Sequence, residues 1–203
     1  MKNFTASIFA GSLLFVSACG NTPQSPPPAP KEDSTATTTA YLPVADYLRA
    51  EISYVDSTPL AIKKFNDLNN RKDSSFIERD EFHQLAKEFL VPELATDSFK
   101  NNYSESSFSD KTSGYLTFTY STQNKKLSLQ RVDVFAAPGT SMDKVKSIYL
   151  QKFSTAGDTT IVKKMFWKMG HNFLILTSLQ VPGKAPLERR LKVVWDEEEE
   201  NTQ

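Results

Sequence analysis

The chain has 203 residues, with 24 basic and 24 acidic side chains, and 39% of its residues are hydrophobic. This length favours one globular domain with appendages. Residues 41–195 hold 22 basic and 17 acidic side chains, and the acidic run Asp196–Glu200 follows them. The basic residues are scattered along the sequence, which argues against a nucleic-acid surface. The only cysteine is Cys19, so no disulfide can form within the chain and the fold depends on its core.

The amino terminus has the parts of an export signal. Lys2 supplies a positive charge, and the apolar segment Phe4–Val16 follows it. Thirteen helical residues span about 20 Å, compared with about 30 Å for the hydrocarbon core of a bilayer. The segment is therefore too short for a stable transmembrane anchor, and no other stretch of the chain is long and apolar enough to span.

The end of this segment, Val16-Ser17-Ala18-Cys19, resembles the lipobox of bacterial lipoproteins: an aliphatic residue, two small residues, then cysteine. The resemblance covers residues 1–21. It implies that residues 1–18 are removed as a signal peptide and that the Cys19 thiol receives a diacylglyceryl group, with a further acyl chain on the new amino terminus. Two or three such chains make membrane attachment stable. The alternative is a plain signal peptide with an incidental cysteine.

Residues 19–40 are expected to be the lipidated cysteine and a disordered tether. The segment after Cys19 is rich in Pro, Ser and Thr and has no large apolar side chain. Gly20 is not the aspartate that retains lipoproteins in the inner membrane, so the resemblance implies the outer membrane, on its periplasmic or its cell-surface side. The layout is similar to that of envelope lipoproteins of Bacteroidota-type bacteria. The implied partner is the membrane, contacted through the lipid anchor.

The domain expected at residues 41–195 begins with two amphipathic helices. Apolar residues recur at helical spacing over 44–55 and again over 82–90, and Ser75 and Glu78 form a capping-box pattern before the second stripe. Between them we expect a short extended segment, Leu60–Phe65, and a polar loop at 66–74. Each helix has one apolar face, so each must pack on another apolar surface.

From residue 115 onward the apolar period changes from about 3.6 to 2, which predicts strands. Most of the breaks between them are short and contain turn residues, which favours antiparallel neighbours. We therefore predict an α+β fold, with two N-terminal helices packed on an antiparallel β-meander of about six strands, and an acidic disordered tail at 196–203. The predicted strands are 115–121, 127–136, 147–154, 159–168, 173–180 and 189–195.

Two strands carry extra information. Phe173–Leu176 is apolar at consecutive positions, which predicts a central strand covered on both faces. In Leu127–Ala136 the apolar positions change parity, which predicts a β-bulge near Gln130 and Arg131.

No motif in the sequence assembles a catalytic, metal or cofactor site. The only histidines are His83 and His171, with no HExxH pattern, and the glycines form no phosphate-binding motif. Residues 141–144 read Ser-x-x-Lys, which looks like a serine–lysine hydrolase motif but lacks the companion motifs. We therefore predict no enzyme activity, no catalytic residues, no metal and no cofactor.

Aromatic residues are the remaining candidates for ligand contacts. The long polar segment 96–114 contains three of them, and others lie on predicted strands. They can belong to the core or can contact a ligand or partner. The candidates are Phe99, Tyr103, Phe108, Phe166, Trp167 and Trp195.

Three hypotheses for function follow. The first is a membrane-anchored envelope lipoprotein that acts as a non-catalytic binding or structural module with a protein, glycan or lipid partner. The second is a carrier of an apolar ligand such as a lipid, held in a groove of a curved sheet. The third is a hydrolase that uses a carboxylate pair with no sequence signature.

Overall fold

The computed structural model describes residues 41–69, 71–95, 97–138 and 144–196. These residues belong to one compact unit that begins at Ala40. The predicted signal peptide, Cys19, the tether and the tail from residue 197 lie outside the described residues. So do residues 141–143 of the Ser-x-x-Lys pattern.

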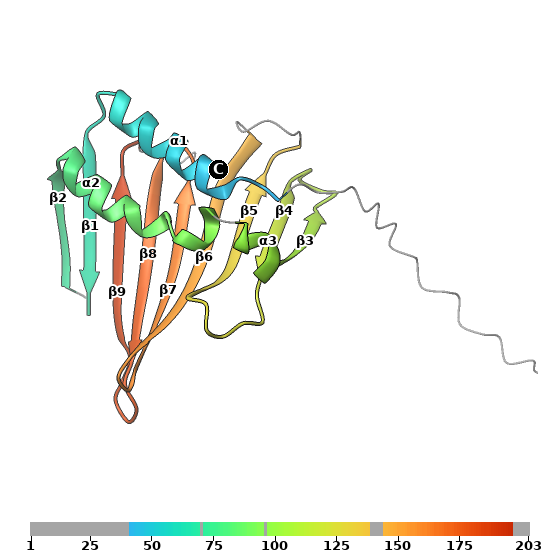
Figure 1. Cartoon of the computed structure of the whole chain (residues 1–203). Helices are drawn as coiled ribbons and strands as arrows, with labels where there is room; N and C mark the ends of the chain where they lie inside the picture. The colour runs from blue at the N-terminus through green and yellow to red at the C-terminus, as the bar shows by residue number, and fades with distance from the viewer. Residues whose placement is uncertain (1–40, 70, 96, 139–143, 197–203) are drawn as a thin grey trace, which may run out of the picture. The chain divides into compact units, whose positions relative to one another are not determined.

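The described chain forms one nine-stranded sheet in which every neighbouring pair is antiparallel (Figure 1). Strands β3 to β9 follow one another as a meander, and β9 pairs with β1, which pairs with β2 at one edge. The spatial order is β2-β1-β9-β8-β7-β6-β5-β4-β3. The strands are β1 (Ile62–Leu68), β2 (Arg71–Ile77), β3 (Ser104–Ser109), β4 (Leu116–Ser121), β5 (Leu129–Ala136), β6 (Val145–Ala156), β7 (Thr159–Lys168), β8 (Asn172–Gln180) and β9 (Leu187–Val194).

The helices lie across one face of this sheet (Figure 1). Their buried side chains, such as Leu48 and Phe82, belong to the same core cluster as Trp167 and Phe173 of the sheet. We call this the covered face and the opposite one the open face. The helices are α1 (Val44–Ser57), α2 (Arg79–Ala86) and α3 (Ser98–Asn102), with 3-10 turns η1 (Lys87–Phe89) and η2 (Pro92–Ala95).

Aromatic rings fill the space between the helices and the sheet. Phe89 lies edge-on to Trp167 with 5.0 Å between ring centroids, and Trp167 stacks on Phe173 at 5.1 Å. Phe82 meets Trp195 edge-on at 5.6 Å. All five side chains are at most 4% exposed. Burying rings of this size is the main stabilising contribution of such a core.

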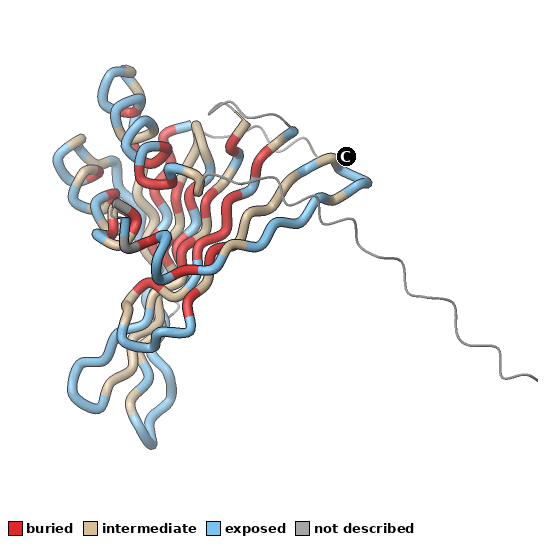
Figure 2. Tube along the Cα trace, turned by 45° about the vertical axis from the view of Figure 1, so that its right-hand side comes forward, coloured by how far each residue is buried: buried red, intermediate tan, exposed pale blue. Residues whose placement is uncertain are grey.

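The buried positions are concentrated in the central strands, on the covered face (Figure 2). The far ends of the β6–β7 and β8–β9 hairpins, residues 154–158 and 182–190, are exposed. None of the described helices is long and apolar enough to cross a bilayer.

The predicted fold class, α+β with two N-terminal helices on about six strands, is wrong. The described chain is mostly β, with nine strands and three short α-helices. The hairpin β1–β2 stands where a loop was expected at 66–74, so α1 and α2 are not consecutive. A further strand, β3, occupies part of the segment 96–114. These strands escaped the sequence analysis because β2 and β3 are mostly exposed and polar and lack alternating apolar residues.

The expectation that Phe173–Leu176 is covered on both faces is also wrong. Phe173 and Ile175 are buried under the helices, whereas Leu174 and Leu176 are only half-buried on the open face. The predicted bulge is confirmed, because the β5–β6 register shifts between Leu129 and Arg131.

Candidate functional site

Successive residues of a strand point to opposite faces of the sheet, and this alternation separates neighbouring lysines. Lys64 lies on the covered face and forms an ion pair with Glu81 of α2, whereas Lys63 lies on the open face. In β7, Lys163 lies on the covered face and pairs with Glu88 of η1, whereas Lys164 lies on the open face. The helices therefore neutralise lysines on their own side of the sheet only.

A row of mostly apolar side chains crosses the open face. Its members lie opposite one another in the register of five adjacent strands, from β6 to β1. At one end, the rings of Tyr149 and Phe166 are 4.8 Å apart between centroids. We call this the central row. It consists of Tyr149, Phe166, Leu174, Lys192 and Phe65.

Basic side chains flank the central row on both sides. One neighbouring row contains Lys168 and Lys63, and the other contains Lys164, Arg190 and Lys72, with Asp67 between the last two. Residues two apart on a strand are separated by about 6.6 Å, so the cations lie about one side-chain width from the apolar row. Lys63 also lies over the rings of Phe65 at 4.9 Å and Phe76 at 6.0 Å.

The open face carries an excess of positive charge. In the part of the chain that the structure describes, no ion pair is found for Lys63, Lys72, Lys164, Arg190 or Lys192. The seven basic side chains on this face are Lys63, Lys72, Arg131, Lys164, Lys168, Arg190 and Lys192, and the three acidic ones are Asp67, Asp133 and Glu188.

One corner of the open face satisfies its own charges. The Asp133 carboxylate is buried, and it accepts hydrogen bonds from Arg131 Nε at 2.8 Å and from the Thr119 hydroxyl at 2.6 Å. Beside it, burial raises the pKa of Tyr149, and the nearby Asp133 carboxylate raises it further. This corner is therefore a self-contained polar cluster, and the uncompensated charge lies on the β7, β9, β1 and β2 side.

Two adjoining grooves are cut into that side of the face. One has a volume of about 570 Å³ and lies over β7, β8 and β9, where Lys164 and Leu176 line it. The other, about 290 Å³, lies over β9, β1 and β2, where Phe65 and Lys192 line it. Arg190 and Asp67, which lie opposite each other in the register of β9 and β1, line both grooves and mark where they meet.

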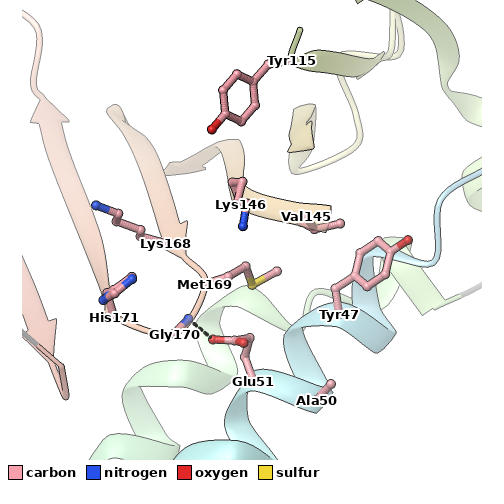
Figure 3. A pocket seen from close by; sticks show the side chains of 10 residues that line it. All are labelled: Tyr47, Ala50, Glu51, Tyr115, Val145, Lys146, Lys168, Met169, Gly170 and His171. Carbon is pink, nitrogen blue, oxygen red and sulfur yellow. Dashed lines mark hydrogen bonds between the residues drawn. The ribbon is translucent and has the colours of Figure 1, made fainter. Parts of the chain in front are cut away.

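A separate cleft of about 620 Å³ opens beside α1 and the β7–β8 turn (Figure 3). Of its lining residues only Glu51 carries a carboxylate, and that group accepts the backbone N–H of Gly170 at 2.6 Å. The Trp167 indole N–H lies 3.5 Å from the same carboxylate. Because the carboxylate is already engaged, this contact acts as a structural link between α1 and the turn.

Comparison of the chain with protein-family models, curated proteins and solved structures gives no match. The assignment of a site therefore depends on the geometry of this chain alone. No group of three or more His, Cys, Asp or Glu side chains gathers as metal ligands among the residues that the structure describes.

The six aromatic candidates fall into two groups. Phe99, Tyr103, Trp167 and Trp195 are at most 4% exposed and pack in the core, so in this structure a ligand cannot reach them. Phe108 and Phe166 are 67% and 41% exposed, and both lie on the open face, although Phe108 is on the edge strand β3.

The basic residues beside Phe166 were not among the candidates predicted from the sequence. They come from strands far apart in the sequence and meet only through the sheet register. Strand alternation was the available signal, because the five most exposed phenylalanines of the described residues all lie on the open face. They are Phe76, Phe108, Phe135, Phe153 and Phe166.

Proposed function

We propose that the protein is a membrane-anchored envelope lipoprotein whose domain is a non-catalytic binding module, and that it binds its partner through the open face of the sheet. The observation that carries the binding role is the central row with its flanking cations. A sheet normally buries an apolar face against another layer of structure. Here the Phe166 ring stays exposed, and Lys63, Lys164 and Arg190 beside the row have no ion-pair partner among the described residues, which is a pattern typical of a recognition surface.

The alternatives have less support from the described residues. An apolar carrier needs a hollow between helices and sheet, and this space is packed with rings. A hydrolase needs two converging carboxylates, and the cleft beside α1 offers one that is engaged by a backbone N–H. The groove over β7, β8 and β9 is lined by Asp67 and Glu188, but Asp67 lies opposite Arg190 and Lys72 in the register.

The anchor is proposed from the resemblance of Val16–Cys19 to a lipobox. Replacing Cys19 with alanine removes the thiol that would be acylated. We expect the C19A chain to lose palmitate labelling and to leave the membrane fraction. A C19A chain that fractionates with membranes as the wild type does would contradict lipid anchoring.

The binding role is tested by photo-crosslinking from the face. A photoreactive phenylalanine analogue replaces Phe166 in the full chain, expressed in its own cells, and a matched chain carries the analogue at Tyr54, an exposed position of α1. We expect adducts after irradiation from position 166 and not from position 54. Equal labelling from both positions, or none from 166, would refute binding through this face, and robust turnover in a hydrolase screen would refute a non-catalytic role.

A further inference from the structure

We infer that the partner of the open face is an acidic polysaccharide, with sugar rings stacked on the central row and carboxylate or phosphate groups bound by the flanking cations. This inference rests on the proposed function and names the chemistry of its partner. Four features of the open face carry it: the order of the rows, their length, the uncompensated charge and the twist of the sheet.

The order of the rows fits a ligand that is apolar in the middle and negative at its sides. The Phe166 ring in the central row is 41% exposed, and the half-buried Tyr149 ring lies beside it, tilted by 45°. A pyranose ring has an apolar C–H face that packs on such a ring, while its acidic substituents project sideways. On one side those substituents meet Lys164 and Arg190, and on the other they meet Lys63.

The length of the central row suits a chain of several sugars. The row crosses five strands, and strands are spaced about 4.8 Å apart, so it extends over about 19 Å. The two adjoining grooves continue along the same strands and meet at Arg190. An arginine at this junction can bind a carboxylate or phosphate through two parallel N–H···O bonds.

The excess positive charge of the open face favours binding of an anion from outside the chain. Lys64 and Lys163 on the covered face have glutamate partners, whereas their neighbours in sequence, Lys63 and Lys164, have none among the described residues. Lys63 and Lys64 share β1, and Lys163 and Lys164 share β7. Within the described ranges, only the helices on the covered face supply glutamates to these lysines, so only the lysine on that face has an ion-pair partner. The open face lacks such a layer in the described chain, and an anionic ligand would complete the pairing.

The twist of the sheet favours a polymer over a bilayer surface. Neighbouring strands in a sheet are rotated by about 20–25°, so a nine-stranded face turns strongly from edge to edge. A planar layer of headgroups can touch only part of a twisted face. A polysaccharide chain can follow it, as oligosaccharides do on other curved antiparallel sheets.

The test is calorimetry with the full chain purified in detergent and polygalacturonate, an acidic pyranose polymer, as the probe. We expect binding that weakens with salt, and no binding to dextran, a neutral polymer. The open-face variant carries Lys63→Gln, Lys164→Gln, Arg190→Gln and Lys192→Gln. Its affinity should fall by at least about tenfold.

The matched control removes four positive charges elsewhere, at the exposed residues Lys87, Lys100, Lys125 and Lys184, each replaced by glutamine. It should bind within about twofold of the wild type, because the net charge changes equally but the open face is intact. Equal losses in the two variants would show attraction to net charge alone and would overturn the inference. Circular dichroism of both variants checks that they remain folded.

Two further probes separate other anionic partners. Vesicles with phosphatidylglycerol and single-stranded DNA carry phosphates, and both are titrated under the same conditions. One of them could bind the wild type more tightly than polygalacturonate does and bind the open-face variant more weakly. In that case the polysaccharide inference fails while the proposed binding function stands. If photo-crosslinking from Phe166 also fails, the proposed function fails with it.

Discussion

Tyr103 connects three parts of the chain at the end of α3. Its hydroxyl donates a hydrogen bond to the Leu129 carbonyl at 2.6 Å, and its own carbonyl accepts one from the Tyr41 hydroxyl at 2.6 Å. Its ring lies 4.5 Å from that of Phe99. Burial raises the pKa of Tyr103, and the nearby Glu93 raises it further, so the hydroxyl stays a proton donor. The side chain therefore has a structural role in the core.

We predict that Tyr103→Phe lowers the free energy of unfolding by about 1–3 kcal/mol. The substitution keeps the ring but leaves the Leu129 carbonyl without its buried donor. Chemical denaturation followed by fluorescence measures the loss. Tyr115→Phe is the control, because Tyr115 is 44% exposed, and it should change stability by less than about 0.5 kcal/mol. A Tyr103→Phe chain as stable as the control would contradict this role.

Among the structural elements, α1 and the β7–β8 turn are linked by Glu51. Its carboxylate accepts the Gly170 N–H at 2.6 Å (Figure 3). Gly170 has a φ of +81°, a backbone conformation that favours glycine, so the turn presents its N–H in a fixed direction. The link holds the helix layer against the end of the central strands.

We predict that Glu51→Ala increases hydrogen exchange at the Gly170 amide by at least about tenfold, because the amide loses its acceptor. Exchange measured by NMR resolves this position from the amides within β7 and β8, which should change less. Arg49→Ala is the matched control, since Arg49 makes only an exposed ion pair with Asp46 on the same helix. Unchanged exchange at Gly170 in Glu51→Ala would exclude the link.

Predictability from sequence also differs from element to element. Strands β4 to β9 were predicted from alternating apolar residues, because one face of each strand is buried. The predicted bounds of β7, Thr159–Lys168, are those observed. The edge strands β2 and β3 were missed, since an edge strand with few buried side chains leaves no periodic apolar signal. Strand alternation can separate Lys63 from Lys64, but it cannot tell which face the helices cover. The candidate site therefore became visible only with the register.

On the scale of the whole molecule, the sheet ends at β2 on one side and β3 on the other, and neither has a second neighbour among the described strands. Unpaired edges invite association with another strand, and charged side chains oppose it. Strand β2 carries Arg71, Lys72 and Asp73 in succession, all exposed, together with Phe76, which is 73% exposed. By this physical argument, the charges of β2 oppose pairing of this edge with another strand.

We predict that the double substitution Lys72→Val and Asp73→Val makes the protein associate as its concentration rises. The change gives the edge a β-branched, uncharged sequence beside Phe76. Light scattering coupled to size-exclusion chromatography measures the molar mass. Lys125→Val with Lys126→Val, in the loop before β5, should leave the mass unchanged. A double β2 variant that elutes as the wild type does at every concentration would contradict a protective role for these charges.

The position of β9 has a consequence for synthesis on the ribosome. This strand comes last in the chain but lies between β8 and β1, so it joins the hairpin β1–β2 to the meander. Before residues 187–194 have been translated, the hairpin β1–β2 has no further strand to pair with, and Val193, which packs in the core, is still missing. The sheet can therefore be completed only after these residues have been made, and a nascent chain released before them holds two unjoined pieces.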